Sequence, residues 1–226
     1  MPQTGLTRRL IFYMKRKKSK TSGNVRARPD FYAQKAKKEH FPARSVYKLK
    51  EIQKKHNLIR PGQVVLDLGC APGSWLLYAA ETAGESGRVI GVDLKAVDMD
   101  LPANVCVFQA DINEMAPEVW QIIDQGVDAV LSDMAPSTTG RKDVDAVRSH
   151  QLCEMALYIA DRALRPGGAF VCKIFQGPDF KAFCDAVRDR FEMMKIFKPA
   201  SCRKDSREIY VIGKGRKQEE TDGRTQ

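Results

Sequence analysis

Several features are scarce or missing in this sequence, and each absence excludes a class of protein. The six cysteines include no C-x-x-C pair, and the three histidines have no cysteine or carboxylate at ligand spacing. These spacings argue against a zinc site and a disulfide framework, so we expect no bound metal and reduced, buried cysteines. No stretch approaches the roughly 18 apolar residues of a membrane-spanning helix, so we expect no membrane contact.

An export signal is missing as well. The apolar stretch after Arg8-Arg9 ends at Met14 and runs into four basic residues, Lys15-Arg16-Lys17-Lys18, which leaves no apolar region of useful length. An organellar transit peptide is disfavoured because lysines outnumber any Ser/Arg bias. We therefore expect a cytoplasmic protein.

Acidic residues are scarce in the first quarter of the chain. Residues 1–60 carry 18 Lys/Arg against 3 Asp/Glu, whereas residues 61–226 carry 20 against 25. Such a one-sided excess attracts polyanions, either nucleic acid or an anionic membrane surface, in a salt-dependent way. The alternative is a solvated tail that only aids solubility.

The residues that are present suffice for one compact domain. Of the 226 residues, 43% are hydrophobic and 29% are charged, which fits a single core and excludes a disordered or collagen-like chain. We predict a flexible basic leader over residues 1–30, a single domain over residues 31–216 and a disordered tail over residues 217–226.

Short apolar runs alternate with helical patterns after Pro61-Gly62. Seven strands are predicted, at residues 64–68, 89–94, 105–109, 127–132, 169–175, 193–197 and 208–213. Helices are predicted from residue 45 to before residue 60, over 75–83, near 119, over 145–164 and over 180–191. The alternation predicts a Rossmann-like α/β fold with a doubly wound, mostly parallel sheet. The last two strands predict an antiparallel hairpin at its edge.

The loop after the first predicted strand is rich in glycine. Ligands of such sheets bind beyond the carboxyl ends of the strands, beside this loop. Gly69 and Gly73 permit a tight turn and a close approach of the backbone to a ligand. A dinucleotide fingerprint would have a second glycine where Ala71 stands, so a pyrophosphate ligand is disfavoured.

Four carboxylates, Asp67, Asp93, Asp111 and Asp133, follow or end successive predicted strands on one rim of the sheet. Together they would repel a pyrophosphate and suit a cationic ligand, so S-adenosylmethionine fits better than NAD. Asp93 lies 20 residues after Gly73, where an acid typically binds the ribose hydroxyls of an adenosine, and Asp111 could accept from the adenine amino group. The alternative is that each acid only caps a helix or a turn.

Three charged residues stand at unusual places in the predicted strands. Lys173 lies inside an otherwise apolar strand, Asp133 ends the neighbouring strand, and Glu208 opens the last one. An unpaired ammonium would be costly to bury there, which favours a partner for Lys173. Taken singly, each is more often a strand-end charge that reaches solvent.

Five separated blocks of the sequence resemble the FtsJ/RrmJ family of RNA ribose 2′-O-methyltransferases. They occur in the order of that family, and the likeness spans roughly residues 30–217. The blocks are Val46-Tyr47-Lys48-Leu49, Asp67-Leu68-Gly69-Cys70-Ala71-Pro72-Gly73-Ser74-Trp75, Ser132-Asp133-Met134-Ala135-Pro136, Lys173-Ile174-Phe175-Gln176-Gly177 and Ser206-Arg207-Glu208-Ile209-Tyr210. The family often has glycine at the position of Ser74 and asparagine at the position of Ser137.

The resemblance implies two sets of functional residues. The catalytic tetrad of the family falls on Lys48, Asp133, Lys173 and Glu208. The family's contacts to S-adenosylmethionine fall on Gly73, Trp75, Asp93, Asp111 and Asp133. We expect Asp67 and Gly69, from the same glycine loop, to belong to the cofactor site as well.

Methyl transfer to a ribose requires a group that orients the weakly acidic 2′-hydroxyl. The enzyme must also accept the proton of this hydroxyl and stabilise the negative charge that develops on its oxygen. Lys173 is the candidate base. Desolvation, Lys48 and the sulfonium of the cofactor favour its neutral form, whereas Asp133 and Glu208 favour the charged form, which would act electrostatically. The sequence leaves both roles open. Lys48 and Glu208 would orient the ribose and Lys173, respectively.

The short core, almost free of insertions, favours the bacterial ribosomal branch of the family, which modifies a uridine of large-subunit (23S-type) ribosomal RNA. The resemblance therefore implies ribosomal RNA as the partner, within the large subunit. The alternatives are ribose methylation of a transfer-RNA anticodon loop or a messenger cap, and a non-catalytic RNA-binding protein that needs only the basic arm. No leucine seam argues for a dimer, so we expect a monomer.

Overall fold

The computed structural model describes residues 30–203 and 205–218. The predicted leader lies outside the described residues except for Asp30, and so does the predicted tail except for Lys217 and Gln218. The described strands are β1 (Val64–Leu68), β2 (Arg88–Asp93), β3 (Val105–Gln109), β4 (Val127–Ser132), β5 (Leu164–Phe175), β6 (Phe191–Phe197) and β7 (Glu208–Arg216). The helices are α1 (Phe31–Lys38), α2 (Val46–His56), α3 (Ser74–Ala83), α4 (Pro117–Ile123), α5 (Lys142–Ala163) and α6 (Phe180–Arg190).

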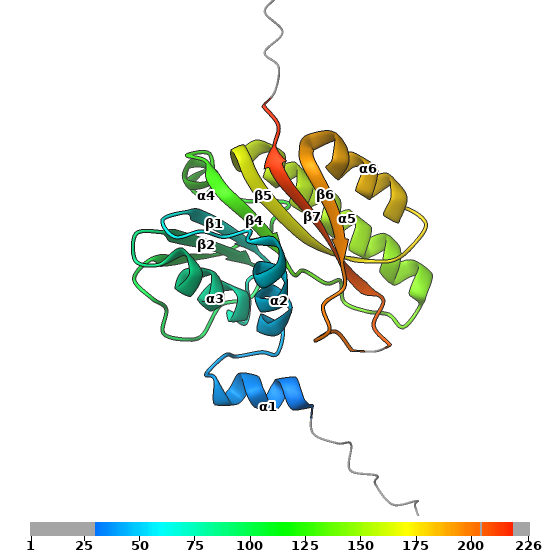
Figure 1. The fold of residues 1–226 in the computed structure, drawn as a ribbon, viewed down its shortest axis with the longest axis horizontal. Helices are drawn as coiled ribbons and strands as arrows, with labels where there is room; N and C mark the ends of the chain where they lie inside the picture. Colours follow the sequence, from blue (N-terminus) through cyan, green and yellow to red (C-terminus); the bar gives the residue numbers. More distant parts are fainter. Residues whose placement is uncertain (1–29, 204, 219–226) are drawn as a thin grey trace, which may run out of the picture.

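The strands form one twisted sheet in the order β3-β2-β1-β4-β5-β7-β6 (Figure 1). Strands β1 to β5 run parallel, whereas β7 is inserted between β5 and β6 and is antiparallel to both. This confirms the predicted mostly parallel α/β sheet with an antiparallel hairpin at one edge. The strand order reverses direction between β1 and β4, which places a ligand crevice at their carboxyl ends.

The two faces of the sheet carry separate cores because neighbouring residues of a strand point to opposite sides. On one face, Val65 packs with residues of α2 and α3. On the other face, Leu66 packs with residues of α4, α5 and α6. Burial on both sides explains why the central strands read as continuous apolar runs rather than as an alternating pattern. Among the described residues, no helix has both the length and the apolar character to cross a membrane.

One helix, α1, is not among the sequence predictions, which place only the beginning of order near Asp30. The Asp30 carboxylate caps α1 by accepting the amides of Tyr32, at 3.1 Å, and Ala33. Tyr32 and Ala36 face the body of the protein and pack against Tyr47 of α2. The signal is weak in the sequence because α1 has only eight residues and a single buried side chain, so tertiary contacts decide its place.

The cysteine prediction is correct for five of the six residues, which are free and buried. Cys106 is free but only half-buried, contrary to the expectation of burial. The reason is its position on β3, which is an edge strand of the sheet. There the side chain of Arg88 from β2 lies 3.7 Å from the Cys106 sulfur.

Candidate active site

The loop between β1 and α3 requires both of its glycines. Gly69 has φ +76°, and a β-carbon there would come within 2.3 Å of Cγ of Met134. Gly73 has φ +109°, and a β-carbon there would come within 2.7 Å of the sulfur of Met99. Neither backbone conformation suits a larger residue, so both glycines are fixed by the turn and by close packing. The neighbouring Ser74 is buried, and its hydroxyl exchanges hydrogen bonds with the backbone of Ala43.

A cavity of about 360 Å³ opens beside this loop at the carboxyl ends of β1, β2, β3 and β4. Four of the predicted site residues line it, namely Gly69, Asp93, Asp111 and Asp133. The Asp93 carboxylate accepts the amide of Ala71 at 2.9 Å and the amide of Lys95 at 2.8 Å, so it fixes the loop as well as facing the cavity. The Asp111 carboxylate accepts the backbone amide and the side-chain amide of Asn113.

Three of the residues predicted to bind the cofactor do not line this cavity. Gly73 lies at the start of α3, and Trp75 is buried in the core, where its indole NH donates to the carbonyl oxygen of Ser45 at 2.9 Å. Asp67, on β1, is only 1% exposed, and neither of its carboxylate oxygens has a hydrogen-bond partner within the described part of the chain. Burial raises the pKa of Asp67 well above its ordinary value, and the nearby carboxylates Asp133 and Asp93 raise it further.

The hydrogen-bond acceptors around the cavity fit a cofactor that carries a positive charge and adenosine hydroxyls. A buried carboxyl without a partner is costly, so Asp67 favours a cationic or hydrogen-bond-donating group beside it. Asp93, Asp111 and Asp133 add acceptors along the cavity wall. An anionic pyrophosphate would meet three carboxylates there, so the structure favours the cationic cofactor over a dinucleotide.

The isolation of Asp67 leads to a prediction about stability. In the range above the ordinary pKa of 3.8, the folded protein binds a proton at Asp67 that the unfolded chain has lost, so the free energy of unfolding falls as pH rises. We expect Asp67→Asn to raise the Tm at pH 8 by about 3 °C or more, with a smaller gain near pH 4. Calorimetry without added cofactor measures both.

The matched control is Asp128→Asn, because the Asp128 carboxylate has partners: it accepts the amide of Val64 and pairs with Arg165. This variant should not gain stability. S-adenosylmethionine should raise the Tm of the wild type more than that of Asp67→Asn, since only the wild type offers a carboxyl to the cofactor. A lower Tm for Asp67→Asn at pH 8 would contradict the assignment.

Lys173 and Asp133 form a largely buried ion pair. The ammonium nitrogen of Lys173 lies 3.0 Å from Oδ1 of Asp133, and their side chains are 7% and 15% exposed. The same nitrogen donates to the backbone carbonyl of Asp133. Tyr210 donates its hydroxyl to Oδ1 of Asp133 at 2.6 Å, and burial raises its pKa well above the ordinary value, so it remains a donor. Lys173 thus has the partner that its apolar strand predicts.

Lys48 and Glu208 form a second pair beside the first. The ammonium nitrogen of Lys48, on α2, lies 3.0 Å from the carboxylate of Glu208 at the start of β7. Their side chains are 11% and 12% exposed, so a small part of the pair reaches the surface. Neither residue occurs in the lining of the cavity described above.

The sheet register brings the two pairs to the same face. Lys173 stands opposite Tyr210 in the antiparallel pairing of β5 and β7, and Glu208 lies two residues before Tyr210, so all three side chains share one side. Asp133 follows β4, whose last residue pairs with Cys172. The four residues that the resemblance implies as catalytic are therefore brought together as two ion pairs at one end of the sheet.

Tyr210 is a site residue to which the sequence analysis assigned no role. Its ring stacks on Trp75, with 5.8 Å between ring centroids, while its hydroxyl donates to Asp133. It therefore links the helix after the glycine loop to the Lys173 pair. The available signal was the spacing of two between Glu208 and Tyr210, which puts both on one face of a strand.

Comparisons with known proteins agree with the family resemblance of the five sequence blocks. Residues 41–216 match the model of a family described as FtsJ-like methyltransferase. A ribosomal RNA large subunit methyltransferase E of Desulforapulum autotrophicum is 59% identical over 83% of this chain and 93% of that protein. The protein of the same name in Desulfosudis oleivorans is 54% identical over 89% of this chain and 97% of that protein.

Solved structures show the same architecture. A ribosomal RNA methyltransferase from Plasmodium falciparum superposes with a TM-score of 0.70 at 27% identity, and the match covers 79% of this chain and 100% of that one. An rRNA methylase from Clostridium thermocellum matches with a TM-score of 0.55 at 20% identity over 76% of this chain and 97% of that one. The second likeness shows the fold alone.

Proposed function

This chain belongs to the FtsJ-like methyltransferase family, and on that premise we propose that it methylates the ribose 2′-hydroxyl of a uridine in large-subunit ribosomal RNA, with S-adenosylmethionine as the methyl donor. One observation carries the proposal: two ion pairs of amines and carboxylates lie on one face of the sheet, and Asp133 of the first pair also lines the cavity beside the glycine loop. Family membership supports methyl transfer, and the names of the relatives support the RNA.

The cofactor would be held by the loop of Gly69 and Gly73 and by the carboxylates around it. Asp93 offers acceptors for ribose hydroxyls, and Asp111 offers an acceptor for the adenine amino group. Asp133 would compensate the positive charge of the cofactor, and Asp67 would offer a carboxyl that has no partner among the described residues as a hydrogen-bond acceptor. When bound, S-adenosylmethionine supplies a methyl group on a sulfonium, which is electrophilic enough to react with an oxygen nucleophile.

The tetrad residues have separate tasks in this proposal. Lys173 faces the ribose hydroxyl and either accepts its proton or stabilises the developing oxyanion as an ammonium. The ion pair with Asp133 fixes the orientation of the Lys173 ammonium, and the hydrogen bond from Tyr210 fixes the orientation of the Asp133 carboxylate. Glu208 pairs with Lys48 and not with Lys173, which the sequence analysis expected it to orient, so Glu208 would instead hold Lys48 while Lys48 positions the ribose. Fixing these groups before the RNA arrives lowers the entropic part of the barrier.

We propose that the protein acts as a monomer in the cytoplasm and that its substrate is the RNA within the large ribosomal subunit. The RNA would be bound through the basic leader and through helix α2, which carries Lys48. The charge excess of residues 1–60 supports this, since cations bind phosphates without regard to sequence. Residues 31–216 would form a single methyltransferase domain.

Removal of residues 1–29 is expected to weaken RNA binding and leave cofactor binding unchanged. These residues contain nine Lys/Arg and no Asp/Glu, and the deletion leaves Asp30 in place to cap α1. Each lost phosphate contact should lower the slope of log Kd against log salt by about 0.7–0.9. Titrations at several salt concentrations measure this. A control of equal length, with glutamine at the nine basic positions, should behave like the deletion; equal RNA affinity in all three proteins would limit the leader to solubility.

The proposed reaction is tested by incubation of the protein and tritiated S-adenosylmethionine with three substrates: isolated large subunits, deproteinised large-subunit RNA and transfer RNA. Label is expected in the ribose of a uridine of the large-subunit RNA. Mapping of the labelled sugar identifies the position. Label in transfer RNA alone would establish the alternative substrate, and an absence of label with intact RNA binding would support a non-catalytic protein.

A further inference from the structure

The outward face of helix α1 carries an exposed aromatic residue among lysines. Phe31 is 68% exposed, and Gln34 and Lys38, three and seven residues further on, are exposed beside it. The opposite face of α1 is used for packing, because Ala36 is 2% exposed and Tyr32 contacts the ring of Tyr47. Packing of the opposite face fixes which side of α1 points to solvent, and Phe31 on that side is not part of the core.

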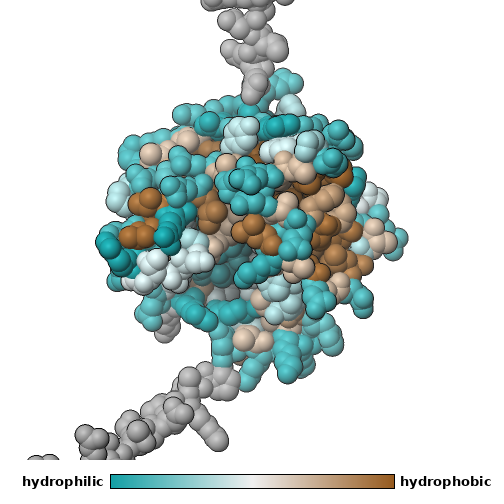
Figure 2. Space-filling view, turned by 180° about the vertical axis from the view of Figure 1, so that it is seen from behind, coloured by the Kyte–Doolittle hydropathy of each residue, from teal (hydrophilic) through white to brown (hydrophobic). Residues whose placement is uncertain are grey.

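The lysines on this helix differ in what they contact. Lys35 is occupied, since its ammonium lies over the ring of Tyr47 and 3.7 Å from Glu39. Lys37 and Lys38 are exposed and form no ion pair with any described residue. Two cations thus accompany Phe31 on the exposed surface. In Figure 2 the end of the molecule that carries α1 is mainly hydrophilic.

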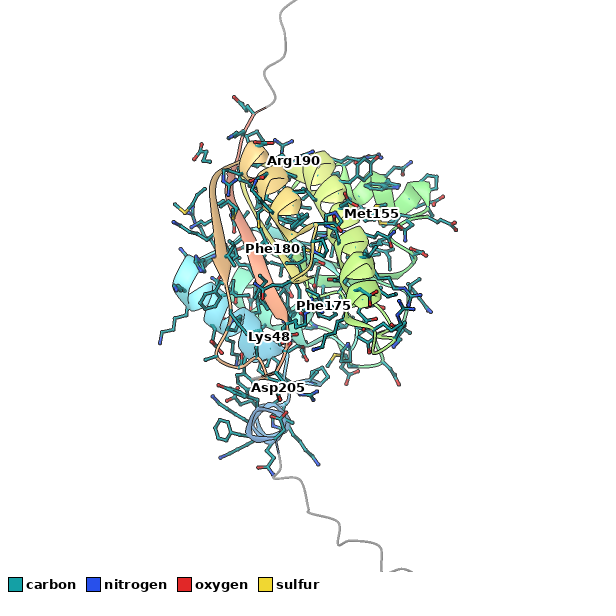
Figure 3. All side chains as sticks on the ribbon, turned by 90° about the vertical axis from the view of Figure 1, so that its right-hand side faces the viewer. Lys48, Met155, Phe175, Phe180, Arg190 and Asp205 are labelled. Atoms are coloured by element: carbon teal, nitrogen blue, oxygen red, sulfur yellow. The ribbon has the colours of Figure 1, made fainter. Side chains whose placement is uncertain are left out.

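Arg44 links α1 to the loop between β6 and β7. Its guanidinium bridges the carboxylate of Asp30, the cap of α1, and the backbone carbonyl of Ser201 in the β6–β7 loop. Glu51 of α2 holds the same loop by accepting the amides of Ala200 and Ser201. Figures 1 and 3 show α1, this loop and Lys48 at the same end of the sheet. Partly buried contacts therefore fix the position of α1 relative to the β6–β7 loop.

A groove leads from α1 toward the glycine loop. It measures about 620 Å³, and its lining includes Lys37, His40, Arg44, Asp98 and Met99. The sulfur of Met99 lies 2.7 Å from the position that a β-carbon of Gly73 would take. A chain that crosses the outward face of α1 can thus continue along this groove to the rim of the glycine loop.

We propose that the outward face of α1 anchors unpaired nucleotides of the RNA next to the target, with a base stacked on Phe31 and phosphates on Lys37 and Lys38. This inference rests on the proposed function and adds a binding surface to it. Proteins that bind single-stranded RNA combine exposed aromatic rings with cations in this way. A protein partner is disfavoured, because lysine is depleted in the centres of protein interfaces.

The test uses the full chain and a 12-nucleotide single-stranded oligouridylate as the probe. Phe31→Ala should raise the Kd for the oligonucleotide by about 5- to 100-fold with an unchanged salt slope, since stacking is lost and phosphate contacts remain. The double variant K37Q/K38Q should instead lower the salt slope. Tyr158→Ala is the matched control, because Tyr158 is an exposed aromatic residue on α5, 55% exposed, and its loss should change neither quantity.

A second variant reports stacking directly. The tryptophan of Phe31→Trp should be quenched by the oligouridylate and not by polyphosphate, after subtraction of the wild-type signal from Trp75 and Trp120. The proposal would be overturned if Phe31→Ala bound the oligouridylate with wild-type affinity, or if polyphosphate quenched the tryptophan equally. A binding defect of Phe31→Ala that appeared only with assembled subunits would overturn it as well. Because binding is read without methyl transfer, loss of methylation with intact quenching would contradict the proposed function alone.

Discussion

Lys173→Ala is expected to reduce methyl transfer by about 1000-fold or more and to leave the affinity for S-adenosylmethionine within about twofold of the wild type. The ammonium nitrogen of Lys173 sits 3.0 Å from the Asp133 carboxylate on the face of the sheet that carries the tetrad. It does not line the cavity that would hold the cofactor. Single-turnover rates with saturating RNA measure the chemistry, and calorimetric titration measures the cofactor.

The matched control is Lys195→Ala, since Lys195 lies on the edge strand β6 away from the tetrad and should be neutral in both assays. Lys173→Arg separates the two roles that the sequence leaves open. Arginine keeps the positive charge but does not release its proton, so it retains part of the rate only if Lys173 acts electrostatically. A Lys173→Ala enzyme with most of its wild-type rate would refute either role.

Asp133→Asn is expected to produce the second large effect, because Asp133 both lines the cavity and pairs with Lys173. The amide has nearly the same shape and can still accept the hydroxyl of Tyr210, but it no longer neutralises Lys173. We expect a fall in kcat of about 100-fold and a weaker affinity for the cofactor. The free energy of unfolding should decrease by about 3 kcal/mol, since an almost buried ammonium loses its carboxylate.

Three measurements on this variant separate the effects: kinetics gives kcat, cofactor titration gives the affinity for S-adenosylmethionine, and denaturant unfolding gives the free energy of unfolding. Asp128→Asn serves as the control, because Asp128 lies at the other end of the same strand, where its loss should not alter kcat. A variant that loses stability and keeps its kcat would limit Asp133 to a structural role. A loss of kcat with full cofactor affinity would remove Asp133 from the cofactor site and leave it in the tetrad.

Much of the fold could be predicted because local patterns agree with the global arrangement. The apolar runs at residues 64–68, 105–109 and 127–132 are strands with those bounds. The boundaries shifted where local patterns are ambiguous. Helix α5 begins at Lys142 rather than at residue 145, and β5 begins at Leu164 rather than at residue 169. Pairing of Leu164 with Val127 extends the strand there, which is a tertiary contact.

The sequence by itself determined the sheet class, the glycine loop and the basic N-terminal region, because each depends on a pattern that can be read within a few neighbouring residues, such as an apolar run or a glycine spacing. The four residues of the proposed tetrad were implied by the resemblance of the five sequence blocks to a known family. The motifs also indicated that the acids would gather at one rim, because the carboxyl ends of parallel strands meet at the same edge.

Only the tertiary structure decided which amine pairs with which carboxylate. Lys48 and Glu208 are 160 residues apart, and Lys173 is 40 residues from Asp133, so their pairing depends on strand order and register. Tertiary structure also left the Asp67 carboxyl without a hydrogen-bond partner among residues 30–203 and 205–218, and it oriented Phe31 outward. The physical reason is that burial and Coulomb interactions depend on distance in space, which a local pattern does not contain.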